Sequence, residues 1–457
     1  MNSKTIIYGW LFIAGLSLEA AGQSGSLQAL IDKAPPGGRV TVSSGVYSGN
    51  IAINKRLSIR GEGWPIIRGD STTSVVSIQA DSCVLEGFII ERSGDNLMHE
   101  DAGVFLKGSH SVIRGNQLRD VLFGVYLLEA DSNTIEENRI TGRRKEDLGQ
   151  RGSGIHIWNS NYNTFTGNII TEARDGFYIQ YAHHTQIERN EVFGLRYGVH
   201  YMYADSNAFI RNTFSDNVAG AAIMYSTGIT MRHNVFSRNR GFSSFGILFQ
   251  DCHGMVADSN VISDNVVGMF FEATTDNIFR HNIVAQNDIA LQMFQNSTGN
   301  VFTENNFIDN ISPLSIVGRK TETRWSVNGQ GNFWSSYEGY DMNGDGVGDV
   351  PMKVQNVFQY LEGRSANLRL YLYSPASQAL AAAAKAFPII EINSEVDGFP
   401  LMRPVDLRNM PALRKAKELM RPGETARTGA GAWLAVPLLS ATLIGFFCHR
   451  ITRRGKV

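Results

Sequence analysis

A chain of 457 residues would normally form two or three domains, but a repeat protein escapes that expectation because it grows along one axis. The 42 Lys and Arg residues nearly balance the 43 Asp and Glu residues, so no overall field indicates nucleic acid as a partner. The 46 Gly and only 12 Pro are typical of a turn-rich β protein, and the three scattered Cys indicate neither a disulfide framework nor a zinc site.

The N-terminal residues resemble an export signal. Lys4 precedes an apolar run from Ile6 to Leu18, and small residues follow up to Gly22. We therefore predict a signal peptide over residues 1–22 and an exported protein, with an uncleaved anchor as the alternative. Residues 26–34 (SLQALIDKA) then carry apolar side chains at helical spacing, before short alternating runs such as RVTV and LSIRG. This order predicts a helical cap over the first turn of a β-solenoid.

A 22-residue repeat runs through the middle of the chain. Three consecutive units, over residues 161–226, read NYNTFTGNIITEARDGFYIQYA, HHTQIERNEVFGLRYGVHYMYA and DSNAFIRNTFSDNVAGAAIMYS. One Asn of the unit, here called the unit Asn, recurs as Asn116, Asn138, Asn168, Asn190, Asn212, Asn234, Asn260, Asn282 and Asn305. One Gly, the unit Gly, recurs as Gly103, Gly124, Gly154, Gly176, Gly198, Gly220, Gly246 and Gly268, and Ala290 replaces it once more.

The constant period predicts an all-β protein, a right-handed parallel β-helix over residues 26–335, because an antiparallel sandwich has no reason to keep one period through so many units. Two steps are longer than the rest, and we expect the extra residues near 141–153 and 238–244 to form loops at the edge of the stack. The unit Asn lies at a bend, where its amide can bond the backbone and tolerate an unusual φ. These amides are expected to form a ladder from coil to coil.

Strand alternation assigns the first and third residues after the unit Gly to the interior, and the second and fourth to the exterior. The exterior pairs are Tyr126/Leu128, His156/Trp158, Tyr178/Gln180, His200/Met202, Ala222/Met224, Leu248/Gln250, Phe270/Glu272 and Gln292/Phe294. A solvated face would carry mainly Lys, Glu, Ser and Thr. This one carries aromatic, His and Met residues with a single carboxylate, which predicts an interaction surface.

Within that face the sequence predicts a copper site. His200 and Met202 lie two residues apart on one strand, roughly 7 Å, and Met224 lies one coil further, about 4.8 Å from Met202. One imidazole and two thioethers suit Cu(I) better than any hard cation. His156 is two coils from His200, roughly 10 Å, and is expected to be a second or transfer ligand. The competing interpretation is a packing surface for a protein partner.

A polar segment after the coils has the spacing of oxygen ligands in a calcium loop. The ligands would be Asp341, Asn343, Asp345 and Asp349, with Gly346 at the sixth position. Met352 stands where a bidentate Glu would complete an EF-hand. We therefore predict a Ca²⁺-stabilised turn, with a Gly-rich polar loop as the alternative.

The C-terminal end indicates a membrane anchor. Residues 336–428 form an extension, and the following residues 429–448 contain no charge and are long enough to cross a bilayer. Basic residues fill the tail at 449–457, so the positive-inside rule puts that tail in the cytoplasm. We predict a periplasmic protein anchored in the inner membrane by a C-terminal transmembrane helix.

Three features together resemble the NosD family, the copper-related maturation proteins of nitrous oxide reductase. They are the 22-residue coils, the segment NFWSSYEGYDMNGDGVGDVPM, and INSEVDGFPLMRPVDL near the end. The coils alone would indicate only the wider group of carbohydrate-binding and sugar-hydrolase β-helices. The resemblance covers roughly residues 26–407, and the C-terminal membrane segment is a departure from it.

The resemblance implies a periplasmic β-helix without enzyme activity. It would work with an ABC-type ATPase and membrane permease, receive copper from a small copper chaperone and help supply it to nitrous oxide reductase. Two alternatives stay open. A β-helix polysaccharide lyase, hydrolase or epimerase would need clustered carboxylates or basic catalytic groups, and the exterior columns offer only Glu272. A metal-free docking scaffold would use the aromatic face alone.

Overall fold

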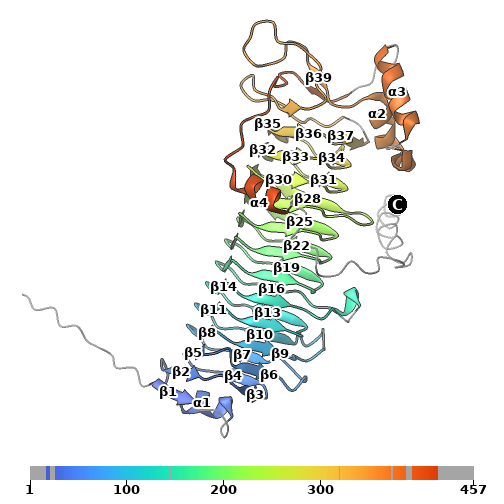
Figure 1. The fold of residues 1–457 in the computed structure, drawn as a ribbon. Helices are drawn as coiled ribbons and strands as arrows, with labels where there is room; N and C mark the ends of the chain where they lie inside the picture. The colour runs from blue at the N-terminus through green and yellow to red at the C-terminus, as the bar shows by residue number, and fades with distance from the viewer. Residues whose placement is uncertain are drawn as a thin grey trace, which may run out of the picture. The chain divides into compact units, whose positions relative to one another are not determined.

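The computed structural model describes residues 17–20, 26–144, 147–318, 320–371, 374–386 and 394–419. Within them the chain winds into a parallel β-helix of about 13 turns, and successive turns add strands to three sheets, A, B and C (Figure 1). The pairings within these sheets are parallel, and each residue lies beside the equivalent residue of the next coil. The predicted right-handed parallel β-helix is therefore confirmed.

The three sheets follow one another in the order A, B, C within each coil. Sheet A consists of β1 (Ser17–Ala20), β2 (Arg39–Val42), β5 (Ser58–Gly61), β8 (Val84–Glu86), β11 (Val112–Arg114), β14 (Thr134–Glu136), β17 (Thr164–Thr166), β20 (Gln186–Glu188), β23 (Ala208–Ile210), β26 (Thr230–Arg232), β29 (Val256–Asp258), β32 (Ile278–Arg280) and β35 (Val301–Thr303). Sheet B consists of β3 (Val46–Ser48), β6 (Ile66–Arg68), β9 (Ile89–Glu91), β12 (Gln117–Arg119), β15 (Arg139–Thr141), β18 (Ile169–Thr171), β21 (Glu191–Phe193), β24 (Thr213–Ser215), β27 (Val235–Ser237), β30 (Val261–Ser263), β33 (Ile283–Ala285), β36 (Asn306–Ile308) and β38 (Phe333–Trp334). Sheet C consists of β4 (Ile51–Ile53), β7 (Val76–Ile78), β10 (Ala102–Leu106), β13 (Phe123–Leu128), β16 (Ile155–Trp158), β19 (Asp175–Gln180), β22 (Tyr197–Met202), β25 (Ala219–Thr227), β28 (Phe245–His253), β31 (Val267–Glu272), β34 (Ile289–Phe294) and β37 (Ser312–Val317).

The core is a continuous column of apolar side chains along the axis of the coils. The first and third residues after the unit Gly are buried in every regular coil, as Phe177 and Ile179 illustrate. Sheet A contributes a second buried column that includes Phe165 and Phe209. Each such side chain removed from water contributes roughly 1.5–3 kcal/mol, so the repeat itself supplies the main stabilising term. The predicted interior columns are confirmed.

The unit Asn residues form the expected ladder. Each Nδ2 donates to the Oδ1 of the next unit Asn, as in the 3.0 Å bond from Asn190 to Asn212. The ladder extends beyond the last regular unit, because Asn305 donates to Asn332 over 2.9 Å. The prediction that the Asn takes the unusual φ is wrong. The residue before the unit Asn has the positive φ, which is 53° at Arg189 and 57° at Arg211. Because the backbone bends at that residue, the Asn amide can point inward.

Both ends of the β-helix are covered by non-repeating segments. At the N-terminal end, α1 (Leu27–Lys33) buries Leu27 and Ile31 and is the helical cap of the β-helix that the sequence predicts. The Ser26 side chain accepts a hydrogen bond from the Ala29 N–H at the start of α1. Near the C-terminal end, α2 (Val357–Arg364), η2 (Ala366–Tyr371) and α3 (Pro375–Ala386) lie beside the last coils (Figure 1). Phe358 of α2 packs against Val267 and Ile289 on the outside of sheet C.

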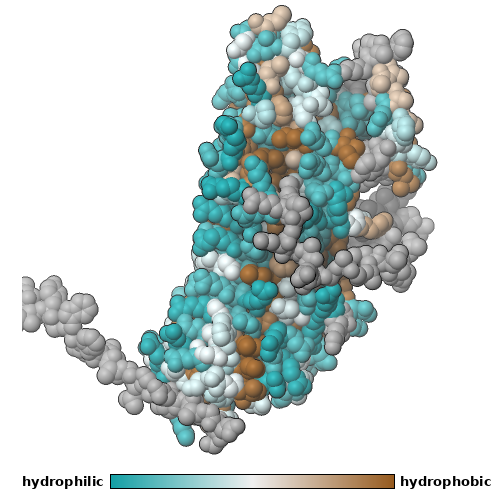
Figure 2. All heavy atoms as spheres, viewed as in Figure 1, coloured by the Kyte–Doolittle hydropathy of each residue, from teal (hydrophilic) through white to brown (hydrophobic). Residues whose placement is uncertain are grey.

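A C-terminal strap, residues 394–416, folds back along the outside of sheet B. It begins at β40 (Val396–Asp397), which pairs with β39 (Met352–Lys353), and it reaches α4 (Pro411–Leu419). Two hydrogen bonds join Val405 to Asn306 of β36, and Lys415 of α4 forms an ion pair with Glu191 of β21. The strap therefore runs against the direction of the coils. Elsewhere the viewed surface is mainly hydrophilic, with hydrophobic patches between the polar columns (Figure 2).

The remaining predicted features are the two loops of the repeat and the two chain ends. The longer steps of the repeat are loops between sheets B and C, and the first contains η1 (Leu148–Gln150). Of the predicted signal peptide only residues 17–20 are described. The predicted transmembrane helix at 429–448 and the basic tail at 449–457 lie outside the described residues. No helix within the described part of the chain has both the length and the apolar character of a membrane span.

Candidate functional site

The outer face of sheet C carries the predicted exterior columns in register. One column runs Tyr126, His156, Tyr178, His200, Ala222, Leu248, Phe270 and Gln292. The other includes Trp158, Gln180, Met202, Met224, Gln250 and Glu272. Side chains in neighbouring coils therefore lie one strand spacing apart, and the sequence-based assignment of these columns is confirmed.

His156 is enclosed by aromatic rings. The rings of Tyr126 and Tyr178 stack on its two sides with centroids 4.4 Å away, and Phe123 meets it edge-on at 5.4 Å. Only 8% of the residue is exposed, and burial lowers the pKa of its imidazole to about 3. Its Nδ1 is buried without a hydrogen-bond partner among the described residues. His156 is therefore neutral at physiological pH, with an unused nitrogen.

His200 lies on the other side of Tyr178, whose ring it meets edge-on at 4.9 Å. The Tyr178 ring thus separates the two histidines that the sequence places two coils apart. The Nδ1 of His200 is 3.6 Å from a carboxylate oxygen of Asp175, and this nitrogen also lacks a hydrogen bond among the described residues. The imidazole consequently has one nitrogen turned towards a negative charge.

Asp175 also lies on the outer face of sheet C, and the sequence did not predict its position there. Its carboxylate is fully buried and accepts bonds of 2.9 and 2.7 Å from Arg196 and one of 3.3 Å from Arg174. Burial alone would raise its pKa, but the contacts with His200 and Arg196 outweigh burial and lower the pKa to about 2. Asp175 is thus an anion at any physiological pH, held between cations.

The repeated Gly is the signal that could have revealed Asp175. Strict alternation assigns the residue before the unit Gly to the interior. The strand pairing instead passes from Asp175↔Tyr197 directly to Phe177↔Val199 and skips the Gly. A Cβ on Gly176 would lie 2.3 Å from a methyl carbon of Val192 in the core, so the Gly and the residue after it both face inward. The preceding residue then points outward.

The two predicted thioether ligands lie beside this polar cluster. Met202 and Met224 are register partners on β22 and β25, and both are half-buried. Next to them the rings of Tyr181, Tyr203 and Tyr225 form an exposed stack, with centroids 5.6 and 4.9 Å apart. His200, Met202 and Met224 therefore share one surface, and the copper ligands stay a prediction. Among the described residues, no three His, Cys, Asp or Glu side chains converge in a way that could hold a metal ion.

In the predicted calcium loop, the acidic side chains bond the loop's own backbone. Asp341 accepts from the Gly344 and Gly346 N–H groups at 2.7 and 2.8 Å, and Asp349 accepts from that of Met342 at 2.7 Å. These bonds hold the loop in a compact turn, in which Asp345 and Asp349 are exposed and Asp341 is half-buried. Calcium binding stays a prediction.

A calcium-stabilised turn should respond to the ion. We expect millimolar CaCl₂ added to the EGTA-treated protein to raise the Tm by a few degrees, because a ligand that binds only the folded state stabilises it by mass action. The D345A variant should lose this increase, whereas MgCl₂ should not produce it because Mg²⁺ requires a tighter octahedral site. The same increase in wild type and D345A would argue for a plain polar loop.

The fold and this face together define a class of protein, a parallel β-helix with ordered columns of aromatic, His and Met side chains on one outer face. Among solved structures, the chain is similar to the A-modules of two Azotobacter vinelandii mannuronan C-5 epimerases. The TM-score is 0.56 for AlgE4, at 14% identity, and 0.54 for AlgE6, at 13% identity; each match covers 66% of this chain and 94% of the module. At these identities the similarity concerns the fold alone.

Comparison with protein families identifies the chain more narrowly. A family model described as "Periplasmic copper-binding protein (NosD)" matches residues 141–339, and one described as a protein of unknown function (DUF1565) matches residues 28–209. The "Probable ABC transporter binding protein NosD" of Pseudomonas aeruginosa is 32% identical over 382 residues, covering 80% of this chain and 88% of that protein. The protein of the same name from Stutzerimonas stutzeri is 28% identical, with coverages of 80% and 87%. The chain belongs to the NosD family.

Proposed function

We propose that this protein is a periplasmic accessory protein that binds copper on the outer face of sheet C and helps deliver it to nitrous oxide reductase. Copper is its cargo, taken from a small copper chaperone, and an ABC-type ATPase and permease are its partners at the inner membrane. The family description and the names of the relatives support a copper-binding role and an association with an ABC transporter. The C-terminal span at 429–448 would anchor it.

One observation supports the copper assignment: His200, Met202 and Met224 all lie on the outer face of sheet C, on two neighbouring strands. An imidazole nitrogen and two thioether sulfurs form a donor set that favours Cu(I). Asp175 lies against Nδ1 of His200, and a carboxylate in this position commonly orients the imidazole of a metal ligand and leaves its Nε2 as the donor. His156 offers a further neutral imidazole two coils away for transfer.

The geometry favours binding over polysaccharide chemistry. A general acid needs a proton that exchanges near neutral pH, whereas Asp175 stays ionised and His156 stays neutral there. Burial raises the pKa of Glu272, the one exterior carboxylate that the sequence identified. However, it lies three coils from His200, roughly 14 Å at strand spacing. Paired catalytic carboxyl groups stand at most about 9.5 Å apart, and Glu272 and Asp175 are separated by four coils, so these two cannot form such a pair.

The decisive experiment is an anaerobic Cu(I) titration against a competing chelator. We expect a His200→Ala/Met202→Ala/Met224→Ala variant to bind Cu(I) at least about 100-fold more weakly than wild type, because changing a residue that only orients a metal ligand already costs about 10–100-fold in affinity. The matched control is His99→Ala/Met98→Ala/Met342→Ala, which removes the same residue types from exposed positions that are not among the proposed ligands.

The outcomes separate the candidate functions. An unchanged affinity in the sheet C variant, or a loss confined to the control, would overturn the proposed site. Absence of Cu(I) binding in the wild type would favour a docking scaffold that uses the exposed stack of Tyr181, Tyr203 and Tyr225. Turnover of a uronate polymer by the wild type would support an enzyme.

A further inference from the structure

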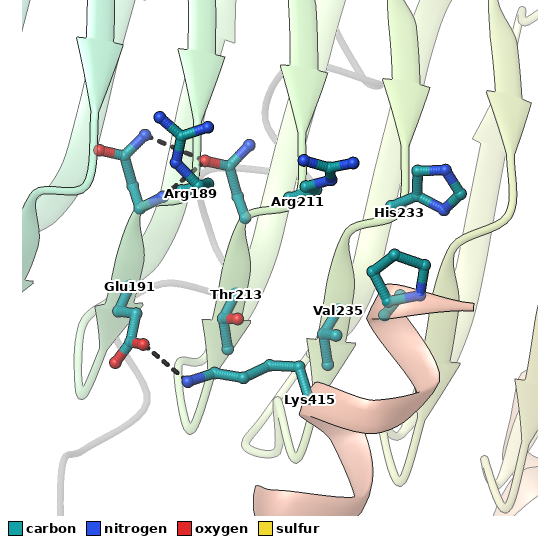
Figure 3. A pocket seen from close by; sticks show the side chains of 11 residues that line it. Arg189, Glu191, Arg211, Thr213, His233, Val235 and Lys415 are labelled. Atoms are coloured by element: carbon teal, nitrogen blue, oxygen red, sulfur yellow. Dashed lines mark hydrogen bonds and ion pairs between the residues drawn. The ribbon is translucent and has the colours of Figure 1, made fainter. Parts of the chain in front are cut away.

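A pocket lies between α4 of the strap and the bend that joins sheets A and B (Figure 3). It encloses about 200 Å³. Arg189, Arg211 and His233 line one side from three successive coils, and Lys415 of α4 reaches in from the other. The pocket exists because the strap folds back over sheet B, so that α4 supplies one of its walls.

The repeat places the three basic side chains in a row. Each is the residue before a unit Asn, where the backbone turns through the left-handed region with φ between 53° and 57°. Successive coils are about 4.8 Å apart, so the Arg189 and Arg211 side chains leave the same bend as close neighbours, as Figure 3 shows. Adjacent like charges repel, and a bound anion would relieve that repulsion.

The charges in the pocket are only partly balanced. Arg189 pairs with Glu188 at 2.5 Å and Lys415 with Glu191 at 2.6 Å. In the part of the chain that the structure describes, the Arg211 guanidinium has no ion pair. The Nδ1 of His233 is buried there without a hydrogen-bond partner. Burial, together with the nearby Arg211 charge, lowers the pKa of His233.

We propose that this pocket binds an anion of the phosphate class, either free phosphate or the headgroup phosphate of a phospholipid. A tetrahedral anion presents oxygens in several directions and can therefore accept from guanidinium groups in adjacent coils and from an imidazole in the next. Arginine is suited to this because its planar donors match phosphate oxygens in pairs. Pro411 in the first turn of α4 also lines the pocket, so the positive end of the helix dipole adds to the attraction.

A lipid source is compatible with the predicted anchor. The segment 420–428 separates α4 from the charge-free residues 429–448, and a segment of that length spans at most roughly 30 Å. The inference is independent of copper, because the pocket lies on the outside of the sheet A to sheet B bend and shares no residue with the proposed copper ligands.

Calorimetric titration of the full chain in a neutral detergent tests the proposal. The probes are inorganic phosphate, dihexanoyl phosphatidylglycerol, and NaCl at matched ionic strength. We expect R211Q to bind the phosphate probe about tenfold or more weakly than wild type, because a charge-assisted contact is lost. The matched control is R232Q, which removes the same charge from an exposed neighbour that does not line the pocket.

Each outcome has a defined meaning. Binding of phosphatidylglycerol alone identifies a lipid site, and binding of inorganic phosphate, with or without the lipid, identifies a site for the free anion. Both support the proposal if R211Q weakens binding and R232Q does not. Absence of binding at millimolar probe, equal losses in the two variants, or the same heat with NaCl would overturn it. An unchanged Tm and unchanged Cu(I) affinity in R211Q establish that the fold and the copper face are intact.

Discussion

Replacing Asp397 with Ala is expected to lower the free energy of unfolding by about 3–5 kcal/mol, because the change leaves two buried backbone N–H groups and an indole N–H without their acceptor. Asp397 is fully buried. Its Oδ2 accepts from the Asn332 N–H at 2.9 Å, from the Trp334 indole N–H at 3.0 Å and from the Asn332 amide at 3.3 Å. Its Oδ1 accepts from the Phe399 N–H at 3.1 Å. Urea denaturation followed by circular dichroism measures the loss.

Two controls identify the cause. D397N keeps the shape of the side chain and one acceptor oxygen. Burial raises the pKa of Asp397, which means that burying its charge costs free energy, and D397N removes that cost. We expect D397N to lose only about 1–2 kcal/mol. D406A removes an exposed carboxylate from the same segment, and its surface ion pair with Arg408 is screened by solvent, so we expect a much smaller loss of stability than in D397A. Equal stability of D397A and D406A would contradict this account.

The contacts of Asp397 explain what the two segments that resemble the NosD family do in the structure. INSEVDGFPLMRPVDL contains Asp397, and NFWSSYEGYDMNGDGVGDVPM begins with the residues that donate to it. The unit Asn ladder ends at Asn332, and Asp397 accepts the bonds that a further coil would otherwise accept. The two segments therefore terminate the β-helix, which explains why they occur together after the coils. The sequence identified both segments but indicated neither their contact nor its purpose.

Repetition determined how much of the fold was predictable. The period and the alternation of apolar residues are local signals, and they were sufficient to predict the coils, the interior columns and the Asn ladder. The strap leaves no such signal, because a segment used once has no period. In retrospect, the outward-facing Val235, Val261 and Ile283 of sheet B are apolar and buried, which an uncovered sheet face would not be. An apolar stretch in an exterior column thus indicates a cover without identifying it.

The candidate site was predictable to the extent that it follows alternation. His156, His200, Met202 and Met224 lie on the predicted face because they occupy regular strand positions. Asp175 was missed because a bend at the unit Gly breaks the alternation. Its partner Arg196 was missed because it lies in the irregular corner before β22. Counting residues along a strand cannot detect a local bulge. A Gly that recurs in every coil does indicate one, because it marks a position at which a Cβ would clash with the core.

Replacing Asn212 with Ala, in the middle of the ladder, is expected to destabilise the protein by about 4 kcal/mol. The Asn212 Oδ1 accepts from the backbone and side-chain N–H groups of Asn190, both at 3.0 Å. Its Nδ2 donates to the Ile187 carbonyl at 2.8 Å and to Asn234 at 3.0 Å. All these groups are buried, so water cannot replace the lost bonds. The same change at the exposed Asn367 should alter the free energy of unfolding by less than about 0.5 kcal/mol.

The isosteric variant N212D separates hydrogen bonding from packing, because it leaves no cavity. An ionised carboxylate still accepts from Asn190, but it cannot donate to Ile187 or Asn234, and the core disfavours its charge. The pKa of the new carboxyl is therefore raised in the folded state relative to the unfolded state, and N212D should be most stable near pH 4 and lose stability as the pH rises. Wild type should not share this dependence. If N212D matched wild type at pH 7 while N212A remained unstable, packing rather than the amide ladder would hold the coils in register. A large loss of stability in both variants would instead mean that the Asn ladder stabilises each junction between coils. One polar residue per coil would then be sufficient to define the period of the whole β-helix.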